Sequence, residues 1–333
     1  MIASRFAGAT MAAFDLLREL ADGEFHSGQD LAERHGVSRT AIWKKIASLQ
    51  ALGLDIERVR GRGYRVSGGV DLLDAATIRD HIEPGADDLL HDLLLFPEID
   101  STNAELQRRG APAHGAAVCL AESQSAGRGR RGRPWVSPFG SSIYLSVVWQ
   151  FQGGAEVLEW LSLAVGVVLA EAIAAMGVPQ PALKWPNDLY LNGAKAAGIL
   201  VELSGDLSGP CTAIIGIGIN VRLPAAPAAQ IDQPWSDLQT AASAPVSRNV
   251  LAAGVINRLL PLLARYEEQG FASWRERWQA LHAHAGKPVI VEQGGRRLAG
   301  IATGVDAQGA LLLHTDSGIH ALRGGEVSLR PAP

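Results

Sequence analysis

Apolar residues recur with different periods along this chain, and the changes of period divide it into three parts. Up to about residue 67, apolar positions repeat every three or four residues, as in Ile42, Ile46 and Leu49, which predicts short helices. From residue 68 to about 285, strand-like and helix-like stretches alternate. We therefore predict a multidomain α+β protein, with domains at residues 1–67, 68–285 and 286–333.

The first part has the pattern of a winged helix-turn-helix. Ser27 and Ser38 are placed to cap two short helices that meet at Gly36. Two strand-like segments, residues 55–59 and 64–66, then flank a basic glycine-containing tip, which predicts a two-stranded wing. Between residues 34 and 65 there are eight basic residues and two acidic ones, a local charge of +6. A helical interaction module with a solvated basic face is the alternative, but the turn, the caps, the charge and the wing together favour DNA binding.

The DNA contacts are expected on the second helix of this motif and on the tip of the wing. One of them is ambiguous, since Trp43 either contacts DNA or packs within the module. The expected DNA-binding residues are Ser38, Arg39, Thr40, Trp43, Lys44, Lys45 and Arg62.

The third part consists of short apolar runs separated by glycine turns. Five such runs, residues 288–292, 298–304, 310–315, 319–322 and 327–330, predict a small β-barrel or sandwich.

Composition is that of an ordinary globular protein, with 47% hydrophobic and 19% charged residues and a net charge of -4. The two cysteines, Cys119 and Cys211, lie far apart in apolar runs, which predicts free thiols and a cytoplasmic location. Charges interrupt the apolar stretch at residues 7–20, so no signal peptide is expected. The most apolar helix, residues 161–176, contains Glu171 and is shorter than the ~20 residues of a membrane span, so no membrane contact is expected.

An arginine-glycine segment lies in the middle of the chain. Residues 127–133 contain four arginines and three glycines, and Trp135 follows. Guanidinium groups resist burial, and they are well shaped to bind phosphate or carboxylate oxygens. A solvated basic linker or RNA-binding tail is the alternative, but the segment lies between two apolar strands, at residues 117–121 and 143–149. We therefore interpret it as a mobile loop over an anion-binding site.

Two further segments of the middle part carry candidate site residues. Residues 183–190 read Leu-Lys-Trp-Pro-Asn-Asp-Leu-Tyr, and Pro186 indicates that Lys184 lies at a strand end, either solvated or in a cleft. The Asn192-Gly193 turn then predicts a hairpin that puts Lys184 and Lys195 on adjacent strands. Residues 214–221 read as a core strand whose glycines allow close approach of a ligand or of another backbone.

These segments together resemble the motifs of biotin–protein ligases. The matching motifs are Ser101-Thr102-Asn103, residues 122–135 around the arginine-glycine loop, Lys184-Trp-Pro-Asn-Asp188 and Gly216-Ile-Gly-Ile-Asn220. With the winged helix in front, the chain resembles the bifunctional form that also represses transcription of the biotin operon. The resemblance covers almost all 333 residues. It implies an N-terminal winged helix-turn-helix, a central mixed α/β ligase domain built on a β-sheet and a C-terminal SH3-like β-barrel.

The resemblance also implies a two-step reaction. Biotin carboxylate attacks the α-phosphate of ATP, with Mg²⁺, to give biotinyl-5′-adenylate, and a lysine of a biotin carboxyl carrier protein then takes the acyl group. Lys184 and Arg130 are implied as catalytic residues. Biotin contacts are implied for Ser101, Thr102, Asn103, Gln124, Gly127, Arg128, Gly129, Arg130 and Lys184. Contacts to ATP or the adenylate are implied for Arg128, Arg130, Arg131, Trp135, Lys184, Asn220 and Trp235.

Operator DNA and a ligand-bound homodimer are the other implied partners. Two alternatives remain at the level of sequence. The first alternative to a bifunctional ligase is a repressor that senses biotin and has little ligase activity. The second is a lipoate–protein ligase, although proteins of that class are expected to lack the winged helix and the arginine-dense loop.

Overall fold

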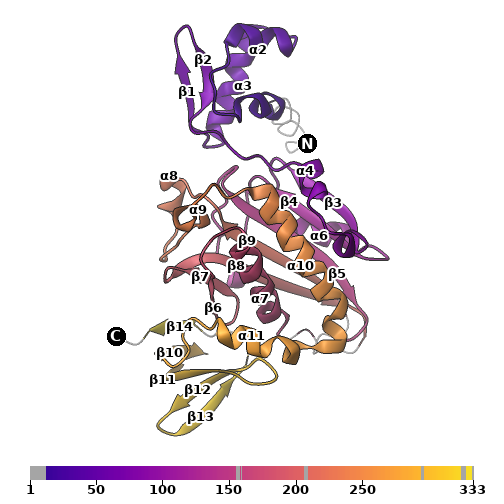
Figure 1. The fold of residues 1–333 in the computed structure, drawn as a ribbon, viewed down its shortest axis with the longest axis vertical. Helices are drawn as coiled ribbons and strands as arrows, with labels where there is room; N and C mark the ends of the chain where they lie inside the picture. Colours follow the sequence, from indigo (N-terminus) through magenta and orange to yellow (C-terminus); the bar gives the residue numbers. More distant parts are fainter. Residues whose placement is uncertain are drawn as a thin grey trace.

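The computed structural model describes residues 13–154, 158, 160–205, 209–293, 296–323 and 328–331. Three parts follow one another along the longest axis (Figure 1): a small helical module, a central sheet with its helices, and a small antiparallel sheet. Within these described ranges, no helix is long and apolar enough to cross a membrane.

The N-terminal module is the predicted winged helix-turn-helix. Residues 13–20 are helical, and α2 (Gly28–Arg34) and α3 (Arg39–Ala51) are capped by Ser27 and Ser38. The buried stripe of α3 is Ile42, Ile46 and Leu49, as the sequence period predicts. The wing is the antiparallel pair β1 (Ile56–Val59) and β2 (Gly63–Val66).

Gly63 fixes the wing against the helices. Its φ of +109° is in the region that favours glycine, and a Cβ at this position would overlap the carbonyl of His26. The close approach allows Tyr64 and His26 to exchange two backbone hydrogen bonds of 2.9 Å each. The wing is therefore an extension of the helical core rather than a free arm.

A seven-stranded mixed sheet forms the centre of the molecule, in the order β3-β4-β5-β9-β8-β7-β6. The β3–β4 pair is parallel and the other pairs are antiparallel. The strands are β3 (Leu90–Phe96), β4 (Ala116–Ala121), β5 (Ser142–Phe151), β6 (Ala182–Lys184), β7 (Asp188–Leu191), β8 (Ala194–Gly205) and β9 (Cys211–Asn220). The predicted mixed α/β domain built on a sheet is confirmed.

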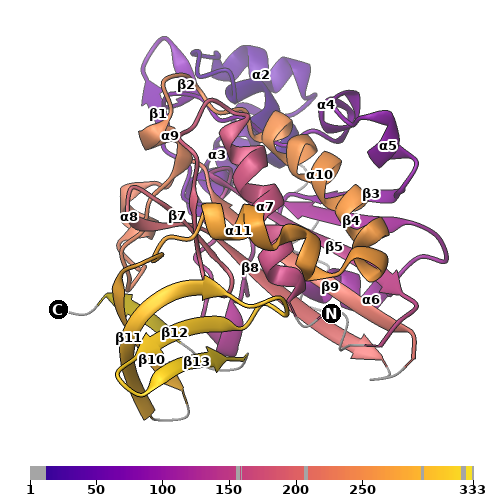
Figure 2. The ribbon, with the colours of Figure 1, turned by 60° about the horizontal axis from the view of Figure 1, so that its bottom comes forward.

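The two faces of this sheet have different neighbours. Helices α7 (Leu161–Ala174), α10 (Arg248–Gln269) and α11 (Arg275–Ala280) lie together on one side (Figure 2) and pack on the main apolar core. Along β4, Val118 and Leu120 belong to this core, whereas Ala117 and Cys119 pack on the other face with Leu106 of α6 (Thr102–Arg109). This second face is only partly covered by α6, and the remainder is available for a site.

One expectation for the central domain needs correction. Lys184 and Lys195 are not on adjacent strands, because the chain turns tightly after Lys184 and β7 lies between β6 and β8. Residues 224–245, which are rich in alanine and proline, contain two short helices, α8 (Ala225–Ala228) and α9 (Leu238–Ala241). The side chain of Asp237 caps α9, which is a local signal that the low complexity of the segment obscured.

The remaining short elements connect the main ones. Helices α4 (Ala75–Asp80) and α5 (Pro84–Asp87) precede β3, and the 3₁₀ turn η3 (Phe271–Trp274) joins α10 to α11. Another 3₁₀ turn, η1 (Arg130–Gly132), lies within the arginine-glycine loop.

The C-terminal part is a five-stranded antiparallel sheet in the order β13-β12-β11-β10-β14. Its strands are β10 (Pro288–Gln293), β11 (Arg296–Val305), β12 (Leu311–Thr315), β13 (Gly318–Leu322) and β14 (Ser328–Pro331). The five predicted strands are present, but the sheet is not a closed barrel in the described residues, since its end strands β13 and β14 are not paired.

One aromatic residue of the central domain completes the core of the winged helix. Phe139 is buried among the apolar side chains of residues 13–66, and its ring meets Phe14 edge to face at 6.3 Å. Nearby, Arg248 forms a buried ion pair with Glu122 and also binds the carbonyl oxygen of Asp71 at 2.7 Å. The segment between the two domains is thus held by packing and by charge.

Candidate functional site

A cavity of about 1060 Å³ opens on the sheet face that α7 and α10 leave free. Its lining comes from the start of α6, the arginine-glycine loop, strands β6 to β9 and the turn that leads into the C-terminal sheet. Pockets for a single small ligand are typically about 300–1,000 Å³, so this cavity is large enough for more than one substrate. Seven arginine or lysine side chains and two acidic ones, Asp188 and Asp232, line it, which makes it strongly cationic.

A connected polar network forms one end of the cavity. The Thr102 amide donates to Gln124 Oε1 at 2.9 Å, and the Thr102 hydroxyl oxygen lies 3.2 Å from the same atom. The Thr102 hydroxyl also pairs with that of Ser146 at 2.7 Å, and Ser146 donates to Asn103 Oδ1 at 2.5 Å. Asn103 then donates to a carboxylate oxygen of Glu202 at 2.7 Å. Because each side chain fixes the next, the network presents donors and acceptors in set directions.

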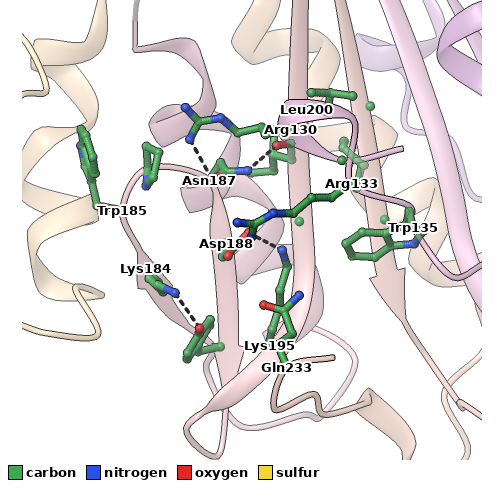
Figure 3. A pocket seen from close by; sticks show the side chains of 18 of the residues that line it. Arg130, Arg133, Trp135, Lys184, Trp185, Asn187, Asp188, Lys195, Leu200 and Gln233 are labelled. Atoms are coloured by element: carbon green, nitrogen blue, oxygen red, sulfur yellow. Dashed lines mark hydrogen bonds and ion pairs between the residues drawn. The ribbon is translucent and has the colours of Figure 1, made fainter. Parts of the chain in front are cut away.

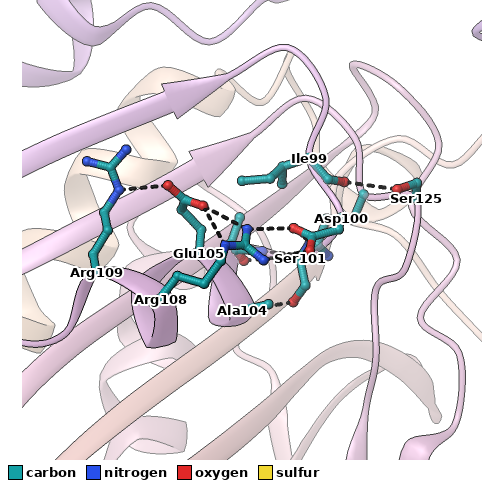
Figure 4. Close-up of polar contacts among 10 residues, drawn as sticks. Ile99, Asp100, Ser101, Ala104, Glu105, Arg108, Arg109 and Ser125 are labelled. Atoms are coloured by element: carbon teal, nitrogen blue, oxygen red, sulfur yellow. Dashed lines mark hydrogen bonds and ion pairs between the residues drawn. The ribbon is translucent and has the colours of Figure 1, made fainter. Parts of the chain in front are cut away.

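The beginning of α6 is held rigidly behind this network. Ser101 caps the helix, and Arg108 forms a forked contact with Asp100 at 2.7 and 2.9 Å (Figure 4). Arg108 and Arg109 both bind Glu105. Hydrogen bonding to Arg108 holds the pKa of Asp100 below its ordinary value. The ion pairs therefore keep both carboxylates charged and the Ser101-Thr102-Asn103 segment in place.

The arginine-glycine loop lies over the cavity and is tied to strand β8 and the β6–β7 turn. Arg128 pairs with Glu202 at 3.2 Å, and Arg130 donates to Asn187 Oδ1 at 3.3 Å. Arg131 has a positive φ of 60°, which is uncommon for a residue other than glycine. Four of the expected loop residues line the cavity, namely Arg128, Gly129, Arg130 and Arg131, whereas Gly127 packs behind them against Gln124 and Trp135.

Trp135 lies flat against the sheet where two glycines make room for it. A Cβ at Gly218 would come within 2.5 Å of the indole ring, and one at Gly198 within 3.0 Å. The neighbouring Gly216 makes room for the Asn103 amide in the same way. The glycines of β9 therefore admit two side chains of the site, in addition to any ligand, and the Gly-x-Gly pattern is explained without a dinucleotide.

Two of the lysines that line the cavity, Lys184 and Lys195, have different partners (Figure 3). Lys195 of β8 forms an ion pair with Asp188 at 2.7 Å, and its ammonium group lies 5.4 Å from the centre of the Trp135 ring. Lys184 of β6 donates to the Tyr190 hydroxyl at 2.9 Å, on the side toward the C-terminal sheet. From the sequence, a role was expected for Lys184 and not for Lys195. In the structure, Lys195 is the lysine nearer Trp135.

Asn220 and Trp235 are brought together, but away from the cavity wall among the described residues. Asn220 is buried and donates to the carbonyl oxygens of Lys195 and Ser236 at 3.4 and 3.0 Å. Trp235 forms an isolated bridge with Lys195. In this structure the pair fixes the loop 234–236 beside Lys195.

Several residues in the cavity wall or in the polar network behind it were not expected from the sequence. Ser146 and Glu202 are polar residues inside apolar strand patterns, and that break in the pattern was an available signal. Asp188 ends the Lys184-Trp-Pro-Asn-Asp188 motif, but no role was expected for it. His284 had no local signal, since it is brought to the cavity by the turn after α11.

All but one of the residues expected to contact DNA are exposed. Arg39, Thr40 and Lys44 are exposed on α3, and Trp43 is 51% exposed, so it does not pack in the core. Lys45 is half-buried. At the wing, the Arg62 guanidinium stacks on the Phe25 ring at 4.1 Å, which holds this cation on the same module.

Three family models match this chain. They are the HTH domain over residues 13–65, the Biotin/lipoate A/B protein ligase family over residues 95–220, and the Biotin protein ligase C terminal domain over residues 284–330. Among solved structures, a biotin protein ligase from Aquifex aeolicus in complex with biotin and ATP is 27% identical. It matches 73% of this chain and 100% of its own length, with a TM-score of 0.63.

Curated relatives match nearly the whole chain. The bifunctional ligase/repressor BirA of Salmonella typhimurium is 42% identical over 97% of this chain and 99% of its own length. The Escherichia coli protein of the same name is 41% identical over 95% of this chain and 97% of its own length. A winged helix, a cationic cavity under an arginine-glycine loop and a C-terminal sheet follow one another in this chain, and the chain belongs to the bifunctional biotin–protein ligase and repressor family.

Proposed function

We propose that this protein joins biotin to a carrier protein in two ATP-dependent steps and represses transcription in response to biotin. The observation that carries the enzymatic part is a cavity in which a hydrogen-bonded network of hydroxyl and amide side chains, ending at Glu202, adjoins a cationic centre. Biotin has a polar ring system and a carboxylate, and ATP is a polyanion, so the two halves of the cavity match the two substrates.

The chemistry of the first step assigns roles to the side chains. A carboxylate oxygen of biotin attacks the α-phosphorus of ATP, and the bond from that phosphorus to the bridging oxygen breaks, so that pyrophosphate leaves with the electron pair. Lys195, between Asp188 and Trp135, is suited to bind the carboxylate and the α-phosphate. Arg130 and Lys184 add positive charge, and the loop limits the access of water to the reactive anhydride.

Substrate contacts are proposed for the two groups of lining residues. Ser101, Thr102, Asn103 and Gln124 would bind the polar rings of biotin, and Arg128 would leave Glu202 to cover it. Trp135 offers an aromatic face for adenine. Asn220 and Trp235 would support the adenylate through the loop that they fix.

Magnesium is proposed to arrive with ATP. The described residues contain no group of three or more His, Cys, Asp or Glu side chains able to hold a metal. Because Mg²⁺ commonly binds through one or two carboxylates and the phosphates of the substrate, this donor set is compatible with a nucleotide-borne ion.

Repression is supported by the exposed basic face of α3 and the wing. One such module contacts only a few base pairs, so we propose that a ligand-bound homodimer binds operator DNA. We also propose an SH3-like fold for the C-terminal sheet, and domain limits at residues 67 and 285.

One assay tests the enzymatic proposal against its rivals. The protein is incubated with ATP, Mg²⁺ and either biotin or lipoate, and acyl-adenylate is separated and measured. Biotinyl-adenylate alone is the expected product. Lipoyl-adenylate would identify a lipoate ligase, and the absence of either product would leave a repressor that only senses its ligand.

A further inference from the structure

The polar network at one end of the cavity ends at the Glu202 carboxylate, which can only accept hydrogen bonds. We propose that Glu202 sets the direction of each hydrogen bond from Asn103 to Thr102, and so makes the Thr102 hydroxyl an acceptor for an N–H group of the substrate. Glu202 is then a positioning residue that selects for a cyclic urea without touching it. This inference rests on the proposed function and adds a specificity determinant for the same site.

The Asn103 side chain has one orientation that satisfies its partners. Its Nδ2 donates to one oxygen of Glu202 at 2.7 Å, while the other oxygen pairs with the Arg128 guanidinium at 3.2 Å. The Asn103 amide is buried against β9, where a Cβ on Gly216 would overlap it. Because the carboxylate has no hydrogen to donate, Asn103 Oδ1 must point away from Glu202 and toward Ser146.

The direction then passes through two hydroxyl groups. Ser146 has a single hydroxyl hydrogen, and it donates this hydrogen to Asn103 Oδ1 at 2.5 Å. In the contact of 2.7 Å between the Ser146 and Thr102 hydroxyls, Ser146 can therefore only accept, and Thr102 donates. Thr102 lines the cavity, and with its hydrogen used inside the protein its hydroxyl oxygen can only accept from a ligand.

Gln124 supplies a donor beside this acceptor. Its Oε1 accepts from the Thr102 amide at 2.9 Å, so its Nε2 is turned the other way, toward the Ser137 hydroxyl at 3.4 Å. Nε2 carries a second N–H, which can donate to a ligand. The two neighbouring side chains therefore offer one acceptor and one donor, which match the N–H and the carbonyl group of a cyclic urea. The dithiolane ring of lipoate has neither group.

Burial makes this direction costly to reverse. Thr102, Asn103 and Ser146 are all buried, so water does not readily replace a lost partner. To donate into the cavity while Ser146 stays bonded, Thr102 would need the whole chain behind it to turn over. Asn103 would then present its carbonyl oxygen to the Glu202 carboxylate. Two buried acceptors facing each other lose a hydrogen bond, so a ligand that requires the reversed direction should bind at least roughly tenfold more weakly.

Replacing the carboxylate by an amide tests the direction of the network. The amide in Glu202→Gln has a similar shape but can donate, so Asn103 can turn over and the Thr102 hydroxyl becomes able to donate to a ligand. The probes are biotin and the two cyclic carbamates in which one ring N–H of biotin is replaced by oxygen. Calorimetry without ATP measures their Kd values. The wild-type protein should prefer biotin to at least one carbamate by roughly tenfold or more, and Glu202→Gln should reduce this preference to roughly threefold or less.

Moving the carboxylate by one position in the chain of hydrogen bonds should restore the preference. In the double variant Asn103→Asp/Glu202→Gln, the carboxylate at position 103 can only accept from Ser146, and the amide at position 202 donates to it. Thr102 must then donate to Ser146 again. A purely structural role for Glu202 predicts no such rescue, because the double variant differs more from the wild-type protein than the single variant does.

Three further variants control for other effects. Ser146→Ala interrupts the chain of hydrogen bonds and should lose the preference as Glu202→Gln does. Arg128→Met removes the loop contact of Glu202 but not its bond to Asn103, so the preference should persist whatever the absolute affinity. Glu268→Gln removes an exposed carboxylate of α10 and should leave the preference unchanged.

Three results would overturn the inference. They are a wild-type protein without the preference, a wild-type preference in both Glu202→Gln and Ser146→Ala even if both bind biotin more weakly, and a folded double variant that does not regain the preference. A wild-type protein that does not bind biotin would refute the proposed function instead. One that binds biotin but forms no biotinyl-adenylate would refute the ligase reaction and leave the preference measurable.

Discussion

At the scale of single residues, Lys184 and Lys195 stabilise negative charge at different places in the cavity. Lys195 is held by Asp188 beside Trp135, whereas Lys184 is held by Tyr190 on the far side of β7. Fixed cations at a centre of developing negative charge are typically worth a few kcal/mol. Both are therefore expected to matter, but in different steps.

We expect Lys195→Ala and Lys184→Ala each to slow adenylate formation by roughly two orders of magnitude or more, with the fold intact. Lys195→Ala should also slow transfer, because the acyl phosphate stays at Lys195, and Lys184→Ala should not. Rapid-quench measurement of each half-reaction distinguishes the two. Adenylation at the wild-type rate would show that the lysine in question is only a surface or structural charge.

Burial of His282 makes folding sensitive to acid. Its ring stacks on Trp278 at 4.7 Å and has no hydrogen-bond partner on either nitrogen within the described ranges. Burial, followed by the charges of His284 and Lys287, lowers the pKa of His282 to about 4. In the unfolded chain the pKa of histidine is about 6.5, so below that pH the unfolded state binds a proton that the folded state does not.

The free energy of unfolding should therefore be highest above pH 6.5 and should fall as the pH is lowered from 6.5 to 4. The loss from His282 is roughly 3 kcal/mol, at about 1.4 kcal/mol per pKa unit. Urea unfolding at successive pH values measures it. His282→Gln should flatten this slope, whereas replacing the exposed His91 should leave it unchanged, and an equal slope in all three proteins would disprove the assignment.

At the scale of elements, the arginine-glycine loop is held in part by contacts that are exposed to solvent. Its described ion pair joins Arg128 to Glu202, both substantially exposed, and such pairs contribute at most about 1 kcal/mol. A bound adenylate would add charge-assisted hydrogen bonds to several of its arginines. The loop is thus expected to exchange weak internal contacts for strong ones to the ligand.

Limited trypsin digestion should cut the loop between residues 128 and 133 in the free protein. Biotin with ATP should protect these bonds, and biotin alone should protect them less. Arg130→Gly is expected to shorten retention of the adenylate more than it weakens binding of biotin. Equal cleavage with and without ligand would rule out closure of the loop.

Sequence patterns determined the elements far better than their assembly into a site. The caps Ser27 and Ser38, the apolar stripe of α3 and the strands β4, β5 and β9 follow from local periodicity. The insertion of β7 between the two lysines depended on how tightly the chain turns at Pro186, which periodicity does not record. His284 reaches the cavity through tertiary packing alone, so no neighbouring residue indicated it.

At the scale of the whole molecule, the ligand loop and the DNA-binding module are close neighbours in the chain and in space. Ser137 receives a hydrogen bond from Gln124 and donates one to the Trp135 carbonyl oxygen. Two residues later, Phe139 lies in the core of the winged helix. Trp135 at the end of the loop and Phe139 in the winged-helix core are only four positions apart, so a displacement of the loop is expected to move the DNA-binding module.

We expect biotin plus ATP to tighten operator binding at constant salt, through a ligand-stabilised dimer. Unmodified carrier protein should weaken it again, since catalysis and dimerisation would compete for the loaded protein. Phe139→Leu should reduce the effect of ligand on DNA affinity more than it reduces adenylation. Operator affinity that does not respond to ligand would mean that the domains are merely tethered.

Phe139 also determines where the chain can be divided. By sequence it belongs to the ligase, and by packing it belongs to the winged helix, where it meets Phe14. A ligase cut off before residue 68 would expose this ring to water, and the isolated DNA-binding module would have a hole where the ring had been. The two modules are therefore not interchangeable parts, and grafting either onto another protein would require a substitute for one phenyl ring.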